Sequence, residues 1–218
     1  MDLHSQLLNN LPVFEVSQMM GKIIDFFDKT TCSHVAITEN NTFLGVLPEN
    51  DLAYFEADKK IEDYRHNLEN FFVTNETSWL DVLEIFARNE ANIMPVIDAD
   101  KHILGYYDLT DIVGVFIGTP FFTEPGGILI VEKGMKDYSM SEIGQIVESN
   151  NAKLLGAFIT DNQNDVVQVT LKISSTSLNE ISQTFRRYNY NILFGNSDDQ
   201  FLEDLKKRSA YLDKYLNV

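Results

Sequence analysis

The side chains that most often bind metals or act as nucleophiles are few in this chain and are not grouped by spacing. The four histidines, His4, His34, His66 and His102, do not stand at the spacing of zinc ligands, and no cysteine pair accompanies them. The one cysteine, Cys32, precedes an apolar run, which favours a small packing residue over a nucleophile. The sequence therefore predicts no metal site and no cysteine chemistry.

The common catalytic and phosphate-binding motifs are not found in the sequence. There is no G-x-S-x-G, no P-loop and no G-x-G-x-x-G. Gly126 and Gly127 precede an apolar strand rather than a helix, so we interpret them as a linker and not as a phosphate cradle. The many carboxylates single out no catalytic pair. We expect that the chain is not an enzyme, although an enzyme of an unfamiliar type stays open as an alternative.

The first half of the chain contains a unit that occurs twice. Residues 33–51 and 92–111 each hold an apolar run, a polar turn, a second apolar run with a glycine, and an acidic end. Gly45 and Gly105 lie 60 positions apart, as do the aspartates that close the two segments. A repeat of this size is a stronger indication of architecture than any single motif.

We extend the match upstream at the same offset of 60 positions, so that Val13 corresponds to Val73. Ser17 and Thr77 are then suitable helix N-caps, because a hydroxyl accepts a backbone N–H. Apolar residues follow at helical spacing in both copies: Met20, Ile23, Ile24 and Phe27 in the first, and Leu80, Leu83, Phe86 and Ala87 in the second. Each copy predicts a short strand, a helix, a strand, a turn, a strand and a helix.

This pattern resembles the CBS domain, and the tandem pair resembles a Bateman module. The resemblance covers roughly residues 11–117. Its most specific part is Gly-h-h-(Ser/Thr)-x-x-Asp, where h is apolar. The segments that begin at Gly45 and Gly105 keep the glycine and the aspartate, but the hydroxyl position holds Pro48 in the first and Asp108 in the second.

In that family the segment holds adenosine ligands, and the resemblance implies the same role here. Asp51 and Asp111 would bind ribose hydroxyls, and the segments at the two glycines would line the purine. The implied nucleotide-binding residues are Gly45, Val46, Asp51, Gly105, Tyr106, Asp108 and Asp111. An acidic residue in the first turn also stabilises a helix N-terminus with no ligand present, and this alternative stays open.

Asp108 stands where relatives present a hydroxyl to phosphate. A carboxylate about 4 Å from a phosphate costs about 4 kcal/mol at an effective dielectric constant near 20. Among the possible ligands S-adenosylmethionine, AMP and ATP, we therefore expect the second copy to prefer S-adenosylmethionine or adenosine to AMP, unless a divalent cation bridges the two anions. The two lost hydroxyl positions favour the other reading, a ligand-free interaction scaffold with degenerate pockets.

Composition and charge narrow the class of protein. The 218 residues are 44% hydrophobic and 23% charged, which are ordinary globular values. The net charge of −16 argues against nucleic acid and against an anionic membrane surface, since both need clustered lysine and arginine. No apolar run is long enough to span a bilayer, and the N-terminus is not a signal peptide. We expect a cytoplasmic protein.

The second half follows a different pattern. Glycine and proline interrupt residues 118–127, which predicts a domain boundary. Two capping boxes, at Ser139 and Ser177, open predicted helices, and the apolar residues of 167–173 alternate as in a half-buried strand. The resulting order βαββαβ is that of a ferredoxin-like fold. After a CBS pair it resembles an ACT domain, and the whole layout resembles the acetoin-utilisation-type CBS proteins.

ACT domains usually bind amino acids at the turn before the first helix, at a glycine near an aspartate. Here Asp137 and Ser139 occupy that turn, but no glycine stands beside Asp137, so an amino-acid site is the weaker expectation. Residues 198–216 hold apolar side chains along one face of a predicted helix, which either packs on its own domain or supplies a dimer contact.

The predicted fold class is α+β, a tandem CBS pair followed by a ferredoxin-like βαββαβ domain. The predicted parts are a lead-in 1–10, CBS units 11–57 and 71–117 around a charged linker 58–70, a linker 118–126, an ACT-like domain 127–195, and a helix 196–218. By resemblance we expect a regulatory or sensor protein that binds an adenosine-containing ligand and forms a homodimer or a higher homo-oligomer.

Overall fold

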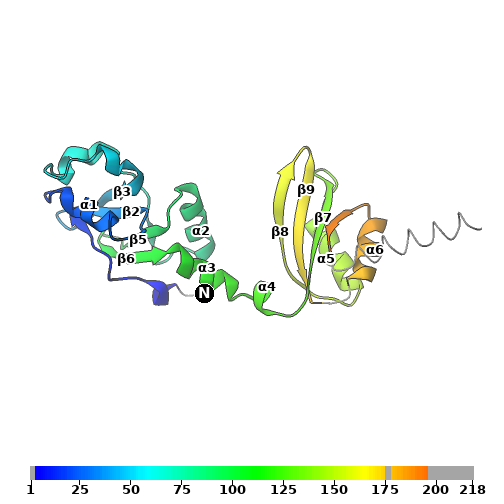
Figure 1. Cartoon of the computed structure of the whole chain (residues 1–218). Helices are drawn as coiled ribbons and strands as arrows, with labels where there is room; N and C mark the ends of the chain where they lie inside the picture. The colour runs from blue at the N-terminus through cyan, green and yellow to red at the C-terminus, as the bar shows by residue number, and fades with distance from the viewer. Residues whose placement is uncertain (1–2, 175–177, 196–218) are drawn as a thin grey trace, which may run out of the picture. The chain divides into compact units, whose positions relative to one another are not determined.

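The computed structural model describes residues 3–174 and 178–195, and it divides the chain into two compact units. The first unit is Met1–Ile117 and the second is Gly118–Val218 (Figure 1). The predicted helix 196–218 lies outside the described residues. Each unit has its own buried core, and each is described below by itself.

The first unit contains two three-stranded sheets of the same design, with orders β1-β2-β3 and β4-β5-β6. In each sheet the first strand pairs parallel to the second, and the second pairs antiparallel to the third. The first copy comprises β1 (Phe14–Glu15), α1 (Gly21–Phe27), β2 (His34–Glu39), β3 (Thr42–Pro48) and η2 (Glu49–Tyr54). The second comprises β4 (Val73–Thr74), α2 (Trp79–Arg88), β5 (Ile93–Ile97), β6 (Ile103–Asp108) and α3 (Leu109–Ile117).

Two further 3₁₀ helices lie in this unit, η1 (His4–Gln6) and η3 (Ile61–Asn67), the latter within the charged segment that follows the first copy. The buried residues of both copies meet in one cluster, where Ala36 and Val46 join Met94, Tyr106 and others. A second cluster fills the space under α1 and η3. The charged segment is thus packed on the fold through Ile61, which is 1% exposed.

The offset between the copies changes at the hairpin. Ile37 pairs with Gly45, eight positions on, whereas Val96 pairs with Gly105, nine positions on. The first hairpin turns tightly through two residues, Asn40 and Asn41, both at positive φ, as the favoured two-residue turn requires. The second hairpin is one residue longer. The copies are therefore 59 positions apart before the hairpin and 60 after it.

This change corrects the upstream match. With the offset of 59, the buried residues of the helices correspond as Ile23 with Val82 and Phe27 with Phe86. The predicted N-caps are also wrong. Helix α2 is capped by Ser78, whose hydroxyl accepts the Asp81 N–H, and α1 has Met20 at the cap position with no side-chain bond. The closing helix of the first copy is a 3₁₀ helix instead of an α-helix.

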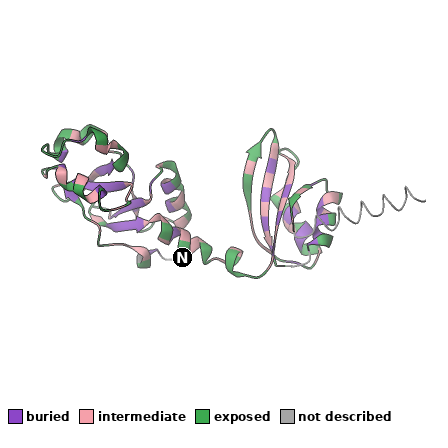
Figure 2. Cartoon of the chain, in the orientation of Figure 1, coloured by how far each residue is buried: buried purple, intermediate pink, exposed green. Residues whose placement is uncertain are grey.

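The second unit is a four-stranded antiparallel sheet with strand order β10-β7-β9-β8 and two helices packed on one face (Figure 1). Its elements are α4 (Pro120–Thr123), β7 (Gly127–Gly134), α5 (Met140–Ser149), β8 (Leu154–Gln163), β9 (Val166–Ile173), α6 (Asn179–Arg187) and β10 (Asn191–Phe194). Along β9, buried residues alternate with half-buried ones, so only one face of the sheet meets the helices (Figure 2). Helix α4 places Phe121 against Phe158 of β8.

Candidate ligand-binding cleft

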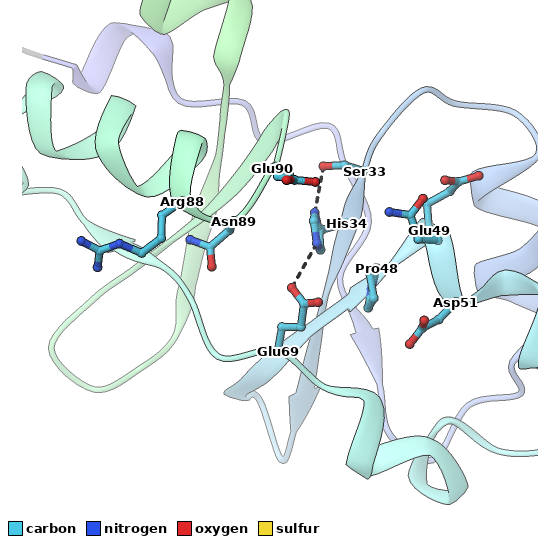
Figure 3. Close-up of a pocket in the computed structure, with 10 residues that line it drawn as sticks. Ser33, His34, Pro48, Glu49, Asp51, Glu69, Arg88, Asn89 and Glu90 are labelled. Atoms are coloured by element: carbon cyan, nitrogen blue, oxygen red, sulfur yellow. Dashed lines mark hydrogen bonds and ion pairs between the residues drawn. The ribbon is translucent and has the colours of Figure 1, made fainter. Parts of the chain in front are cut away.

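A polar cavity of about 460 Å³ opens in the first unit, at the ends of strands and helices from both copies (Figure 3). Its wall is formed by five parts of the unit: the start of β2, the end of β3, the first residues of η2, the segment after η3 and the end of α2. The lining residues are Ser33, His34, Pro48, Glu49, Asn50, Asp51, Glu69, Arg88, Asn89 and Glu90. A cavity of this size is large enough for a nucleoside.

Backbone and side-chain bonds hold the wall in place. The Glu49 N–H donates to the Ser33 carbonyl over 2.8 Å, which ties the start of η2 to the start of β2. Asn67 donates from Nδ2 to Asp51 Oδ2 over 2.8 Å and so orients that carboxylate. Glu90 follows the C-cap of α2 at a φ of 49°, the left-handed conformation that ends many helices.

The two copies are joined at the edge of this cavity by a reciprocal pair of hydrogen bonds. The Ser33 N–H donates to Asn92 Oδ1 over 2.8 Å, and the Asn92 N–H donates to Ser33 Oγ over 2.9 Å. The two residues are 59 positions apart and therefore correspond in the two copies. The pair fixes the start of β2 against the start of β5.

A buried imidazole forms the floor of the cavity. His34 is 5% exposed, and its ring contacts Phe71 edge-on. Its Nδ1 lies 2.8 Å from Ser33 Oγ, and its Nε2 lies 3.3 Å from Glu69 Oε2. Burial lowers the pKa of His34, and the Glu69 carboxylate partly opposes this. Because a carboxylate only accepts, the neutral ring donates from Nε2 to Glu69 and accepts from Ser33.

An apolar hollow of about 530 Å³ adjoins the polar cavity, since Ser33 and Glu90 line both. Its other lining residues are Leu83, Phe86, Ala87, Ala91, Asn92 and Leu109. The cleft formed by the two hollows therefore combines a polar chamber with an apolar one. A ligand with a flat apolar ring and a polar, hydroxyl-bearing part has the matching composition.

Of the predicted nucleotide-binding residues, Asp51 lines the polar cavity. Gly45 and Gly105 do not line this cavity. Each allows the backbone of another segment to approach closely. A Cβ on Gly45 would lie 2.8 Å from the Glu69 carbonyl oxygen, and one on Gly105 would lie 2.6 Å from the Leu8 carbonyl oxygen. Val46 and Tyr106 are in the shared core, with exposures of 0% and 1%.

Tyr106 connects three segments of the core. Its hydroxyl donates to the Pro12 carbonyl over 2.8 Å and accepts the Ala36 N–H over 3.2 Å. Burial raises the pKa of Tyr106, which keeps the hydroxyl protonated as this arrangement needs. The side chain thus has a complete structural role between the two copies.

Asp108 and Asp111 lie at the start of α3. Asp108 Oδ1 accepts the Thr110 N–H over 2.7 Å, as an N-cap residue does. Asp111 is half-buried in the first turn. In the second unit, Ser139 caps α5 by accepting the Glu142 N–H, and exposed Asp137 lies in the turn between β7 and α5.

The residues that sequence reasoning missed are His34, Glu69 and Glu90. One signal was available, because an imidazole inside an apolar strand needs polar partners if it is buried. Glu69 and Glu90 carry no such signal, since each is one of many acidic residues in charged segments. Their place in the cleft depends on how η3 and α2 end.

A cation could also be held at the second hairpin. The ligand atoms of Asp98, Asp100 and His102 lie within 4.8 Å of one another. Asp98 already accepts the backbone N–H groups of Asp100 and His102, and these bonds hold the pKa of Asp98 below its ordinary value. The cluster is therefore explained as a turn.

Within residues 3–174 and 178–195, none of the helices has the length and apolar character that a membrane span requires.

Comparison with known proteins finds a CBS domain over the region of the second copy. The family model of the CBS domain matches residues 61–118. A CBS domain pair/ACT domain protein from Thermotoga maritima is 19% identical over 54% of this chain and 97% of that one, with a TM-score of 0.48. The CBS domains of a transcriptional regulator from Streptococcus pneumoniae are 14% identical over 52% and 98%, with a TM-score of 0.47.

A third solved structure contains ligands. The CBS domain pair of protein MJ0100, in complex with 5′-methylthioadenosine and S-adenosyl-L-methionine, is 15% identical over 54% of this chain and 97% of that one, with a TM-score of 0.45. None of the curated proteins matches the chain. Residues 61–118 thus match a CBS domain, and the chain is similar to solved CBS domain pairs.

Proposed function

We propose that this chain is a cytoplasmic regulatory or sensor protein whose first unit binds an adenosine-containing ligand. The observation that carries the proposal is the cleft at Asp51, where a polar cavity adjoins an apolar hollow. Asp51 would accept hydrogen bonds from the ribose hydroxyls, and the apolar hollow would take the base. Structures similar in fold lend support, namely the cytosolic domain of the Mg²⁺ channel MgtE with ATP, CBSX2 with AMP, and the CBS domain pair of protein MJ0100 with S-adenosyl-L-methionine.

The second unit would transmit the binding event. Its βαββαβ order and its strand order of β10-β7-β9-β8 support an ACT-like, ferredoxin-like domain. The face of its sheet opposite the two helices carries half-buried and exposed apolar residues, including Phe158 and Phe194. Such a face supports the assembly of the chain as a homodimer or a higher homo-oligomer.

A second candidate is a ligand-free scaffold. Pro48 and the helix-capping Asp108 replace the two hydroxyls that the motif would offer to a phosphate. In this case the duplicated unit would serve assembly alone. The candidates differ in whether any adenosine compound stabilises the first unit.

A thermal-unfolding titration separates the two candidates. The only tryptophan, Trp79, lies in α2, so its fluorescence reports the first unit. A ligand at 100 times its Kd adds about 2.7 kcal/mol to the free energy of unfolding. We expect at least one of adenosine, S-adenosylmethionine, AMP and ATP to raise the Tm. If none of them shifts it at millimolar concentration, the scaffold replaces the sensor.

A further inference from the structure

The cleft at Asp51 is rich in hydrogen-bond acceptors. Four carboxylates line it, contributed by η2, by the segment after η3 and by the end of α2: Glu49, Asp51, Glu69 and Glu90. Arg88 is the one lysine or arginine among the lining residues. With His34 neutral, the lining groups carry a formal charge of −3, from four carboxylates and one guanidinium.

Two donors of the cleft are engaged within the protein, and a third lining position has no amide to donate. Pro48 has no N–H, and the Glu49 N–H donates to the Ser33 carbonyl. The side chain of Asn89 donates to the Ile85 carbonyl over 2.7 Å. At the place where the motif's hydroxyl would meet a phosphate, neither Pro48 nor Glu49 therefore offers a free amide.

The positive charge of the cleft is directed elsewhere. Arg88 is paired with Glu84 one turn earlier on α2, and Figure 3 shows its guanidinium pointing away from His34 and Asp51. The His34 imidazole donates to Glu69 and accepts from Ser33, so both of its nitrogens are used within the protein. Neither the guanidinium nor the imidazole of the lining is thus directed at an anion in the cleft.

We propose that this cleft selects its ligand by charge: it takes an adenosine-type ligand with a positively charged, hydrogen-donating substituent at the 5′ position and rejects one with a phosphate there. The inference rests on the proposed function and specifies the ligand class of the same site. Ribose hydroxyls and an ammonium or sulfonium group are the partners that ionised carboxylates prefer. Carboxylates near a phosphate repel it, which amounts to about tenfold or more in affinity even at the dielectric constant of a protein surface.

A series of three ligands that differ only at the 5′ position tests the proposal. The probes are 5′-amino-5′-deoxyadenosine, adenosine and AMP, titrated by calorimetry at low ionic strength without divalent cations. We expect the amine to bind at least about tenfold tighter than adenosine, and AMP to bind at least about tenfold weaker. The differences shrink as salt is added, because the carboxylates are partly exposed.

Two variants assign the selectivity to this cleft. In the double variant Glu49→Gln and Glu90→Gln, we expect the affinity ratio of amine to AMP to fall at least about tenfold. The control is Glu76→Gln, which removes a carboxylate that does not line the cleft. Its ratio stays at the wild-type value.

The outcomes separate the inference from the function that it rests on. If AMP binds as tightly as adenosine without a divalent cation, charge selection is wrong but adenosine binding stands. If the ratio survives in the double variant, the selectivity does not come from these carboxylates and the inference is overturned. If none of the three probes binds, the proposed function and the inference are overturned together.

Discussion

The two copies in the first unit end in different ways, although both contain the same Gly and Asp at the same spacing. In the first copy β3 ends at Pro48, a 3₁₀ helix follows, and Asp51 lines a cavity. In the second copy β6 ends at Asp108, which accepts the Thr110 N–H and begins the nine-residue helix α3. The two copies thus differ both in the residue at the hydroxyl position and in the kind of helix that follows it.

The copies also differ where their central strands begin. His34 opens β2, and the corresponding residue of β5, at the offset of 59, is Ile93. Both are buried, but only the histidine recruits a carboxylate, Glu69. The two copies have therefore diverged at this position, and the polar residue of the first copy lines the proposed binding site.

The largest predicted effect is on stability, and it tests which copy contributes more to the shared core. Tyr106→Ala removes a buried ring and leaves the Pro12 carbonyl and the Ala36 N–H without their partner. We expect it to lower the free energy of unfolding of the first unit by about 3–5 kcal/mol. Val46→Ala at the matching place of β3 costs less, because fewer buried atoms are removed. Urea unfolding followed by Trp79 fluorescence measures both, and a smaller loss for Tyr106→Ala would contradict the assignment.

The glycines give the next largest effect. In Gly105→Ala the new Cβ lies 2.6 Å from the Leu8 carbonyl oxygen, 2.6 Å from Asn9 Oδ1 and 2.9 Å from Leu7 Cγ. In Gly45→Ala the nearest atom is the Glu69 carbonyl oxygen at 2.8 Å, with the others beyond 3 Å. Overpacking of this kind costs about 1–3 kcal/mol. We expect Gly105→Ala to be the more destabilising of the two in the same urea experiment, and the reverse order would count against the backbone approach at Leu8.

A smaller effect separates the two aspartates. Asp51→Ala removes the carboxylate from the cleft, and we expect adenosine to bind at least about tenfold more weakly, a loss of about 1.4 kcal/mol. Asp111→Ala affects the first turn of α3 and leaves the lining of that cleft intact. Calorimetry on both variants decides between them. Equal losses would show that the second copy binds as well, and a loss in Asp111→Ala alone would move the site.

The repeat, the order of helices and strands along each copy and the change of pattern after residue 118 could be predicted, because each depends on local apolar periodicity and on turn residues. The change of offset could not be predicted. The second hairpin, at Asp98, is one residue longer than the first, at Asn40, so the glycine segments stay 60 positions apart while the residues before the hairpins are 59 positions apart. The cap of α2 lies at Ser78 and not at Thr77, whose hydroxyl accepts the Thr74 N–H. The cleft was half predictable: Asp51 lies within the motif, whereas Glu69 and Glu90 reach it through tertiary packing.

The role of Tyr106 was not predictable from its place in the motif. The motif implies that it lines the purine, but strand alternation and the core of two copies turn it inward, where its hydroxyl meets Pro12, 94 positions away. Such a long-range partner has no local signal in the sequence. By contrast, the N-cap at Ser139 was predicted, because Ser139 and Glu142 lie within one helical turn, although the Ser139 N–H donates to the Tyr190 hydroxyl and not to Glu142 as a full capping box requires. The second predicted capping box begins at Ser177, which lies outside the described residues.

The last prediction concerns the histidine that distinguishes the copies. Burial lowers the pKa of His34 below its ordinary value of 6.5, and the Glu69 carboxylate opposes this shift. The unfolded chain then binds a proton more readily than the folded one between the folded pKa and about pH 6.5. Stability from this group is fully present above about pH 6.5 and is lost as the pH falls toward the folded pKa.

Melting the protein between pH 7.5 and pH 5.5 with Trp79 fluorescence tests this. We expect the Tm of the first unit to fall on acidification in the wild type and to fall less in His34→Gln, which cannot take up a proton. Glu69→Gln removes the group that raises the pKa of His34, so its Tm should fall more steeply than that of the wild type. The position of the second copy is not titratable, since Ile93 stands there, and the pH dependence therefore belongs to the cleft of the first copy. A wild-type slope that persists in His34→Gln would separate the acid sensitivity of this unit from the imidazole.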